Sequence, residues 1–158
     1  MKKVLNNKKG FTLIELLAVI VILAILVMVA IPAVTKYLNS ARQGTFADNA
    51  KSAISAVRND VIMNGYGTKT YSLTEINNLL EKKLTTSPWG KAYASTSCIA
   101  VDTDATSGAT TYSMCLVDDD GHGWTTAVSE DKIGCDGEGC IKAAIPVSAN
   151  KTCSCTSS

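Results

Sequence analysis

The sequence contains a single histidine, His122, and it has neither a glycine-rich phosphate loop nor a Cys-x2-Cys zinc pattern. Nucleophilic catalysis by serine or cysteine needs a base within reach of the nucleophile, and the sequence places no partner for His122. Zinc sites usually combine closely spaced cysteines with histidines. We therefore expect no enzyme, no cofactor and no catalytic or metal-binding residues, and we interpret His122 as a solvated turn residue.

Charged side chains are also scarce, at 18% of the chain, and none occurs from Leu16 to Thr35. About 20 apolar residues in a helix span the hydrocarbon core of a bilayer. The whole chain carries a net charge of +1, and without residues 1–10, which hold four lysines, eleven basic and fourteen acidic side chains give −3. The uncharged run predicts membrane insertion. The slightly negative balance argues against nucleic acid as a partner, although a local basic patch stays open.

The first 97 residues contain no cysteine, whereas the last 61 residues contain six. An even number of cysteines confined to one region predicts disulfide bonds made in an oxidising compartment. Six cysteines permit 15 pairings, and their spacing does not choose among them. The disulfide candidates are Cys98, Cys115, Cys135, Cys140, Cys153 and Cys155.

The apolar run begins within the segment Lys8-Lys9-Gly10-Phe11-Thr12-Leu13-Ile14-Glu15-Leu16-Leu17. A carboxylate inside a membrane segment costs about 2.5 kcal/mol or more, so Glu15 is a candidate functional residue. An ordinary secretory signal fits poorly, because the run is too long and lacks a small-x-small cleavage site. A plain membrane anchor stays open, since hydropathy alone does not exclude it.

This segment resembles the N-terminus of type IV prepilins and their pseudopilin relatives in its short basic leader, its Gly10–Phe11 junction and its lone Glu15. The resemblance implies that a prepilin peptidase cuts after Gly10 and methylates Phe11, and that assembly machinery polymerises the subunit into a helical filament. Glu15 lies one helical turn from the Phe11 amine, and in the family the carboxylate pairs with the amine of a neighbouring subunit. Such a charge pair is strong where the dielectric is low.

The resemblance and the residue pattern together predict an α+β pilin fold, a long N-terminal helix packed on an antiparallel sheet. Apolar residues recur at spacings of 4, 3 and 4 from Ala50 to Val61, which indicates an amphipathic helix. Pro32 predicts a helix kink and Gly44 a possible bend. The expected parts are a leader (1–10), a transmembrane and assembly half of the helix (11–35), an amphipathic half (36–64), a connecting region with a short helix (65–91), and a β head with a disulfide-rich C-terminus (92–158).

In the connecting region, Ser72 and Glu75 form a capping-box pattern that predicts a helix over about 73–83. The expected strands are 92–101, 111–117 and 123–128, joined as an antiparallel meander.

A hairpin centred between Thr106 and Ser107 would place Cys98 opposite Cys115, where a cross-strand bridge could form. Cys135 and Cys140 flank a tight turn that a bridge between them would close. Cys153 and Cys155 are too close in sequence to bond easily with each other, so each is expected to bond elsewhere.

The carboxylates of the segment Asp118-Asp119-Asp120-Gly121 could bind a Ca²⁺ ion. The full calcium-loop signature with a distal Glu is missing, so we favour an acidic turn.

The leading hypothesis is a type IV pilus subunit, held by one span in the cytoplasmic membrane before assembly and exposed on the cell surface afterwards. Adhesion, motility or biofilm formation would be its tasks, and the cysteine-rich head suits an exposed fibre. The alternatives are a pseudopilin of a secretion system, a competence pilus subunit for DNA uptake, and an anchored protein without a filament. The lysine-rich leader and the cysteine-rich head suggest a Gram-positive source.

Overall fold

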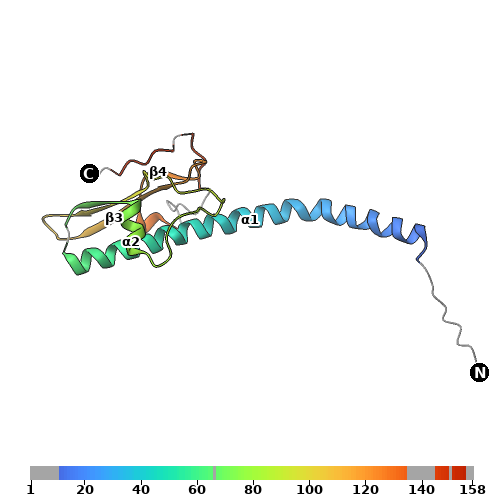
Figure 1. Cartoon of the computed structure of the whole chain (residues 1–158), viewed down its shortest axis with the longest axis horizontal. Helices are drawn as coiled ribbons and strands as arrows, with labels where there is room; N and C mark the ends of the chain where they lie inside the picture. The colour runs from blue at the N-terminus through green and yellow to red at the C-terminus, as the bar shows by residue number, and fades with distance from the viewer. Residues whose placement is uncertain (1–10, 66, 135–144, 150, 156–158) are drawn as a thin grey trace, which may run out of the picture. The chain divides into compact units, whose positions relative to one another are not determined.

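A computed structural model describes residues 11–65, 67–134, 145–149 and 151–155 of the chain (Figure 1). It divides the chain into two compact units, Met1–Asn39 and Ser40–Ser158. A long helix, α1 (Leu13–Asn64), and a four-stranded antiparallel sheet confirm the predicted α+β fold.

The amphipathic stripe of α1 is buried as its spacing predicts. Ala50, Ile54 and Val57 are fully buried, and Val61 is nearly so. The helix continues without a break through Pro32 and Gly44. It ends where Gly65, with a φ of 67°, donates its backbone N–H to the Val61 carbonyl at 2.9 Å, which is a left-handed cap of the kind that glycine favours.

The strands are β1 (Lys69–Ser72), β2 (Cys98–Thr103), β3 (Thr110–Val117) and β4 (Gly123–Ser129). They lie in the sheet in this order, and every neighbouring pair is antiparallel. The strand expected at 92–101 begins only at Cys98, because Ala92 and Tyr93 form isolated bridges with Thr86 and Asp118 instead. The edge strand β1 was not predicted, since four residues are too few for a clear alternation.

One hydrophobic core joins the buried stripe of α1 to one face of the sheet, through residues such as Ile99 and Met114. Phe46 is fully buried in it, with its ring centroid 5.8 Å from that of Trp89, 5.9 Å from that of Tyr93 and 5.1 Å from that of Trp124. The two pairs with tryptophan are edge-on, and such pairs add to the free energy that burial of their area provides.

The short helix α2 (Leu73–Leu79) has the predicted capping box. The Ser72 backbone N–H donates to Glu75 Oε2 at 2.8 Å, and the Glu75 N–H donates to Ser72 Oγ at 3.4 Å. The prediction that this helix reaches residue 83 is wrong. The Asn77 side chain accepts a hydrogen bond from the Leu84 N–H at 2.6 Å and donates to the Leu84 carbonyl at 3.3 Å, so the chain turns back before another helical turn can form.

The predicted hairpin register is confirmed, since Cys98 lies opposite Cys115 on β2 and β3. The cross-strand bridge suggested between them is wrong, because Cys98 bonds to Cys155 and Cys115 bonds to Cys153. Cys153 and Cys155 are two residues apart, and in an extended segment such side chains point the same way about 6.7 Å apart. Cys98 and Cys115 lie about 5 Å apart on adjacent strands, so each of them can bond to one of the two. Cys135 and Cys140 lie outside the described residues.

Replacing the Cys115–Cys153 pair by two serines is expected to lower the free energy of unfolding by about 3 kcal/mol, below the loop-closure value for a separation of 38 residues because the Cys98–Cys155 bond already restricts the unfolded chain. Urea denaturation of the full-length chain in uncharged detergent measures this change. Ser154→Ala, which alters an exposed residue between the two bonded cysteines, is the control and should change it little. An unchanged midpoint in the double variant would contradict the expectation.

Candidate functional site

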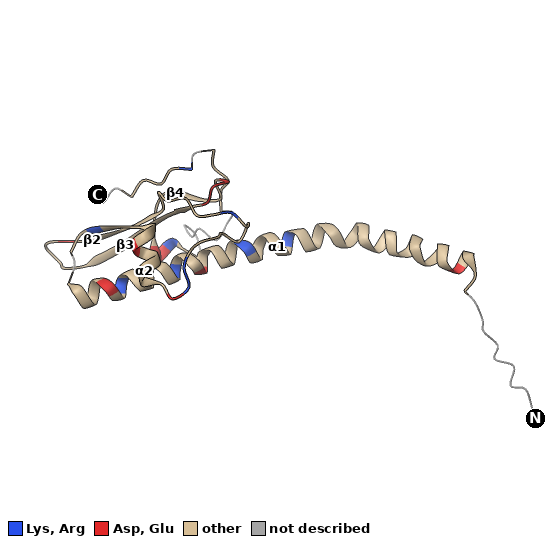
Figure 2. Ribbon diagram, in the orientation of Figure 1, with Lys and Arg blue, Asp and Glu red and all other residues tan. Residues whose placement is uncertain are grey.

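The first part of α1 has an uninterrupted apolar surface. From Phe11 to Leu38 every large apolar side chain is exposed, with exposed fractions between 49% and 93%. By length and composition, α1 is the one helix among the described residues that qualifies as a membrane span, and its most apolar 18 residues have a mean hydropathy of 3.2. Figure 2 shows one acidic residue near the start of this stretch and one basic residue near its end, with no charge between them. Apolar surface on this scale is stable only when lipid or other protein covers it.

Glu15 is held by its own chain in the first turn of α1. Its Oε2 accepts hydrogen bonds from the Thr12 backbone N–H at 2.8 Å and from Thr12 Oγ1 at 2.7 Å. Thr12 Oγ1 in turn accepts from the Glu15 N–H at 3.3 Å. This is a capping box, the same device that begins α2. The role of Thr12 was missed, although Thr-x-x-Glu before an apolar run is the signal for it.

The pairing of Glu15 with the Phe11 amine requires a cut chain. In the uncut chain the Phe11 nitrogen belongs to the peptide bond with Gly10, so it carries no charge. Gly10 itself lies outside the described residues. The Phe11 side chain is 93% exposed and is not part of a folded core. The processing and assembly roles of these residues therefore stay predictions.

The helical turns around Pro32 have an unusual hydrogen-bond pattern. Proline has no N–H, so the carbonyl four residues earlier, that of Met28, loses its helical donor. Thr35 Oγ1 donates to the Ile31 carbonyl at 2.8 Å, a side-chain bond of a kind that often bends helices. The predicted kink at Pro32 stays a prediction, since α1 is one continuous helix from Leu13 to Asn64.

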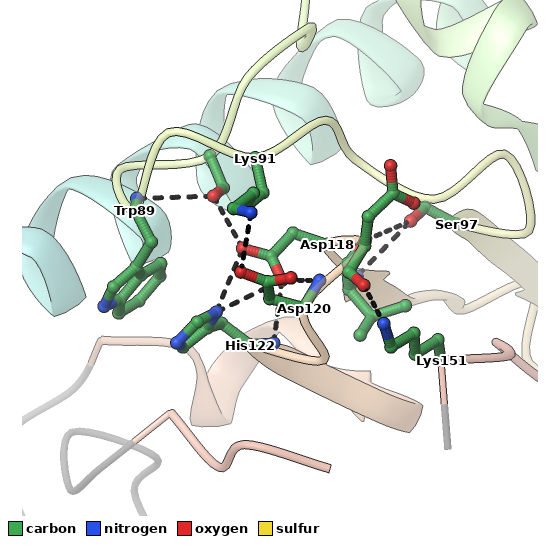
Figure 3. A network of polar contacts seen from close by, with 10 residues as sticks. Trp89, Lys91, Ser97, Asp118, Asp120, His122 and Lys151 are labelled. Atoms are coloured by element: carbon green, nitrogen blue, oxygen red, sulfur yellow. Dashed lines mark hydrogen bonds and ion pairs between the residues drawn. The ribbon is translucent and has the colours of Figure 1, made fainter. Parts of the chain in front are cut away.

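A second polar site surrounds Asp118, whose side chain is fully buried (Figure 3). Its carboxylate accepts hydrogen bonds from Ser87 Oγ at 2.7 Å, from the Asp120 N–H at 3.0 Å and from the His122 N–H at 2.9 Å. His122 Nδ1 lies 3.2 Å from both Asp118 carboxylate oxygens. The site joins the chain around Ser87 to the turn between β3 and β4.

The interpretation of His122 as a solvated residue is wrong. Its ring is half-buried and stacks on Trp89, with the ring centroids 4.7 Å apart. Asp120 forms an ion pair with Lys91 at 3.1 Å. With the Asp118 carboxylate committed to backbone and side-chain donors, the acidic segment serves to close a turn.

The Asp118 site predicts a pH dependence of stability. Burial raises the pKa of the Asp118 carboxyl, but hydrogen bonds from Ser87, His122 and Asp120 outweigh this effect and hold the pKa below its ordinary value of 3.8. The ionised form is thus favoured in the folded chain, so its contribution is complete above about pH 4 and is lost as the pH falls through the lowered pKa.

Asp118→Asn is expected to lower the free energy of unfolding by about 2 kcal/mol at pH 7. The difference from the unaltered chain should shrink below pH 4, and urea denaturation at a series of pH values measures it. Asp119→Asn, which alters an exposed neighbour, is the control. A difference that stays constant from pH 7 to pH 2 would contradict the argument.

The geometry defines a class of protein in which an exposed apolar helical segment continues into a disulfide-bonded α+β unit. A family profile described as the prokaryotic N-terminal methylation motif matches residues 5–31. A protein named "Fimbrial protein" from Moraxella nonliquefaciens is 46% identical over 57 residues, which are 34% of this chain and 37% of that protein. No solved structure matches the chain. The chain carries the N-terminal methylation motif of type IV pilins, which confirms the resemblance seen in the sequence.

Proposed function

We propose that this protein is a structural subunit of a type IV pilus. The observation that supports this most directly is the exposed apolar segment of α1, which carries one carboxylate, Glu15, in its first turn and lies largely within the matched motif. A membrane span needs no carboxylate there, whereas a polymer that pairs it with a neighbouring amine does. The similarity to a fimbrial protein supports the same function.

In this proposal a prepilin peptidase cuts after Gly10 and methylates Phe11, while the membrane holds α1. The new amine lies next to Thr12, whose N–H and hydroxyl already bind Glu15. On assembly, the Glu15 carboxylate exchanges these local partners for the amine of a neighbouring subunit. Burial of the apolar segments against one another then replaces their contacts with lipid, and the assembly machinery supplies the work of extraction.

The remaining unit, Ser40–Ser158, would form the surface of the fibre and carry adhesion, motility or biofilm formation. Its two described disulfides suit exposure outside the cell, because covalent links stabilise a small domain in an oxidising environment.

Electron microscopy of fibres sheared from cells, with mass spectrometry of their main component, tests the proposal. Long fibres composed mostly of this chain, beginning at a methylated Phe11, are the expected result. Suppose instead that a strain without this gene still makes fibres but is defective in secretion or transformation. That result would overturn the pilus proposal in favour of a pseudopilin or a competence pilus subunit. If the chain stays in the membrane and is not cut after Gly10, the remaining interpretation is a plain membrane anchor.

A further inference from the structure

A polar pocket of about 260 Å³ lies between α1 and the segment that follows α2. None of the described residues that line this pocket is acidic. Figure 2 shows that charged residues gather in the loop after α2, over the side of α1. The polar residues used in the argument below are Thr45 and Asn49 from α1, and Lys82, Lys83, Thr85 and Thr86 from the loop.

Lys82 and Lys83 differ from three other basic residues of this unit. Arg58, Lys69 and Lys91 each have an acidic partner. Within the described parts of the chain, Lys82 and Lys83 have neither an ion pair nor a side-chain hydrogen bond, and both are exposed at the pocket. Two uncompensated positive charges beside a concave surface raise the local concentration of anions.

The loop that carries the two lysines is anchored at both ends. On one side, the Asn77 side chain binds the N–H and the carbonyl of Leu84. On the other, the Ser87 N–H donates to the Lys91 carbonyl at 2.7 Å, and Ser87 Oγ donates to the buried Asp118 carboxylate. A loop that is already ordered loses little conformational entropy when a ligand binds, so the pocket is prepared for one.

The available donors indicate what kind of anion fits. Thr45 Oγ1 donates to the Ala41 carbonyl and Asn49 Nδ2 donates to Tyr93 Oη, so the α1 wall is already committed. Among the described residues of the loop, the Thr85 and Thr86 hydroxyls join the two ammonium groups as free donors. These are four donor groups, two of them positively charged. They match the several oxygens and the negative charge of a phosphate better than the two oxygens of a carboxylate.

We propose that this pocket binds a phosphate group and that the membrane holding α1 supplies it, as the headgroup of an anionic phospholipid. Lys36 and Arg42 lie between the apolar segment and the pocket in the sequence of α1, and both are exposed. Basic residues next to a span are attracted to anionic headgroups, each by about 1 kcal/mol. The site acts in the single subunit before assembly, so it does not depend on polymerisation.

Native mass spectrometry of the full-length chain in uncharged detergent tests the proposal. Dioleoyl phosphatidylglycerol is titrated as the probe, with dioleoyl phosphatidylcholine and inorganic phosphate as competitors. We expect the double variant Lys82→Gln/Lys83→Gln to bind phosphatidylglycerol at least tenfold more weakly. Thr85→Ala/Thr86→Ala should weaken it several-fold, and circular dichroism checks that each variant is folded.

Lys51→Gln/Lys132→Gln is the matched control, because it removes the same charge from two exposed lysines outside the pocket. Equal losses in both lysine double variants would overturn the proposal, as would unchanged binding in the pocket variant. Displacement of the lipid by inorganic phosphate at millimolar concentration would assign the phosphate to a free source, whereas no displacement supports the lipid.

A third outcome separates this site from a subunit contact. If the Lys82/Lys83 variant binds phosphatidylglycerol normally but forms no fibres, the two lysines face an acidic surface of a second copy, and the phosphate site is overturned. Fibre formation by that variant together with weakened lipid binding supports the site. Absence of fibres from the unaltered chain would count against the pilus proposal alone.

Discussion

Glu15→Ala is expected to leave cleavage after Gly10 intact and to lower the yield of filaments at least a hundredfold. In a filament the carboxylate would be enclosed by apolar segments, where loss of one partner of an ion pair costs about 3–5 kcal/mol. Each 1.4 kcal/mol changes an association constant tenfold, so this cost corresponds to two orders of magnitude or more. The measurement is the mass of sheared fibre per cell, with mass spectrometry of the Phe11 terminus.

Thr12→Ala is the informative control. It removes the hydroxyl that binds Glu15 in the first turn but keeps the carboxylate, so it should cost about 1 kcal/mol of helix capping and spare most of the filament. Normal filament yield with a fully methylated Phe11 in the Glu15→Ala strain would refute the role of this residue in assembly. A loss of equal size in Thr12→Ala would reassign Glu15 to helix capping.

Gly123→Ala is expected to lower the free energy of unfolding by more than 4 kcal/mol, a loss large enough to unfold many domains. Gly123 begins β4 with a φ of 140°, and an added Cβ would lie 2.1 Å from the Leu116 carbonyl oxygen and 2.7 Å from Val117 Cα. Both are backbone atoms of β3, the strand with which β4 pairs. The clash therefore cannot be relieved by turning a side chain, and the two strands must separate.

Gly90→Ala separates the effect of the clash from that of backbone conformation. Gly90 also has a positive φ, 83°, but nothing lies within 4 Å of an added Cβ. Its substitution should cost about 1–2 kcal/mol, the price of the left-handed conformation alone. Urea denaturation of both variants in detergent measures the difference, and equal losses would show that the approach of β4 to Leu116 is not tight.

The parts of the fold that the sequence predicted are those with a regular period or a local motif. The stripe from Ala50 to Val61 follows the helical repeat over several turns, and the box of Ser72 and Glu75 depends only on four consecutive residues. The register of β2 against β3 follows from the centre of one hairpin. Each of these depends on residues near one another in the chain.

The parts that were missed depend on contacts between distant residues. The length of α2 is limited by Asn77 binding Leu84, and the position of His122 depends on Trp89. The choice of partners for Cys98 and Cys115 depends on where the C-terminal segment lies, which no local pattern records. The capping role of Thr12 is the exception, because its signal was local.

For the candidate site, the sequence predicts Gly10, Phe11 and Glu15 through one continuous motif. It did not indicate the pocket beside Lys82 and Lys83. Two adjacent lysines usually form a solvated surface, and only the folding of their loop against α1 gives them a shared concave surface.

The Cys98–Cys155 bond closes a covalent loop across a separation of 57 residues. When the chain is pulled between α1 and its C-terminus, that loop cannot extend, so about 190 Å of contour length is withheld from unravelling. Tension passes directly from β2 to the last described residues. Under mechanical load the segment between α1 and Cys98 is therefore the part that yields, while β3, β4 and the acidic turn stay enclosed by the covalent loop.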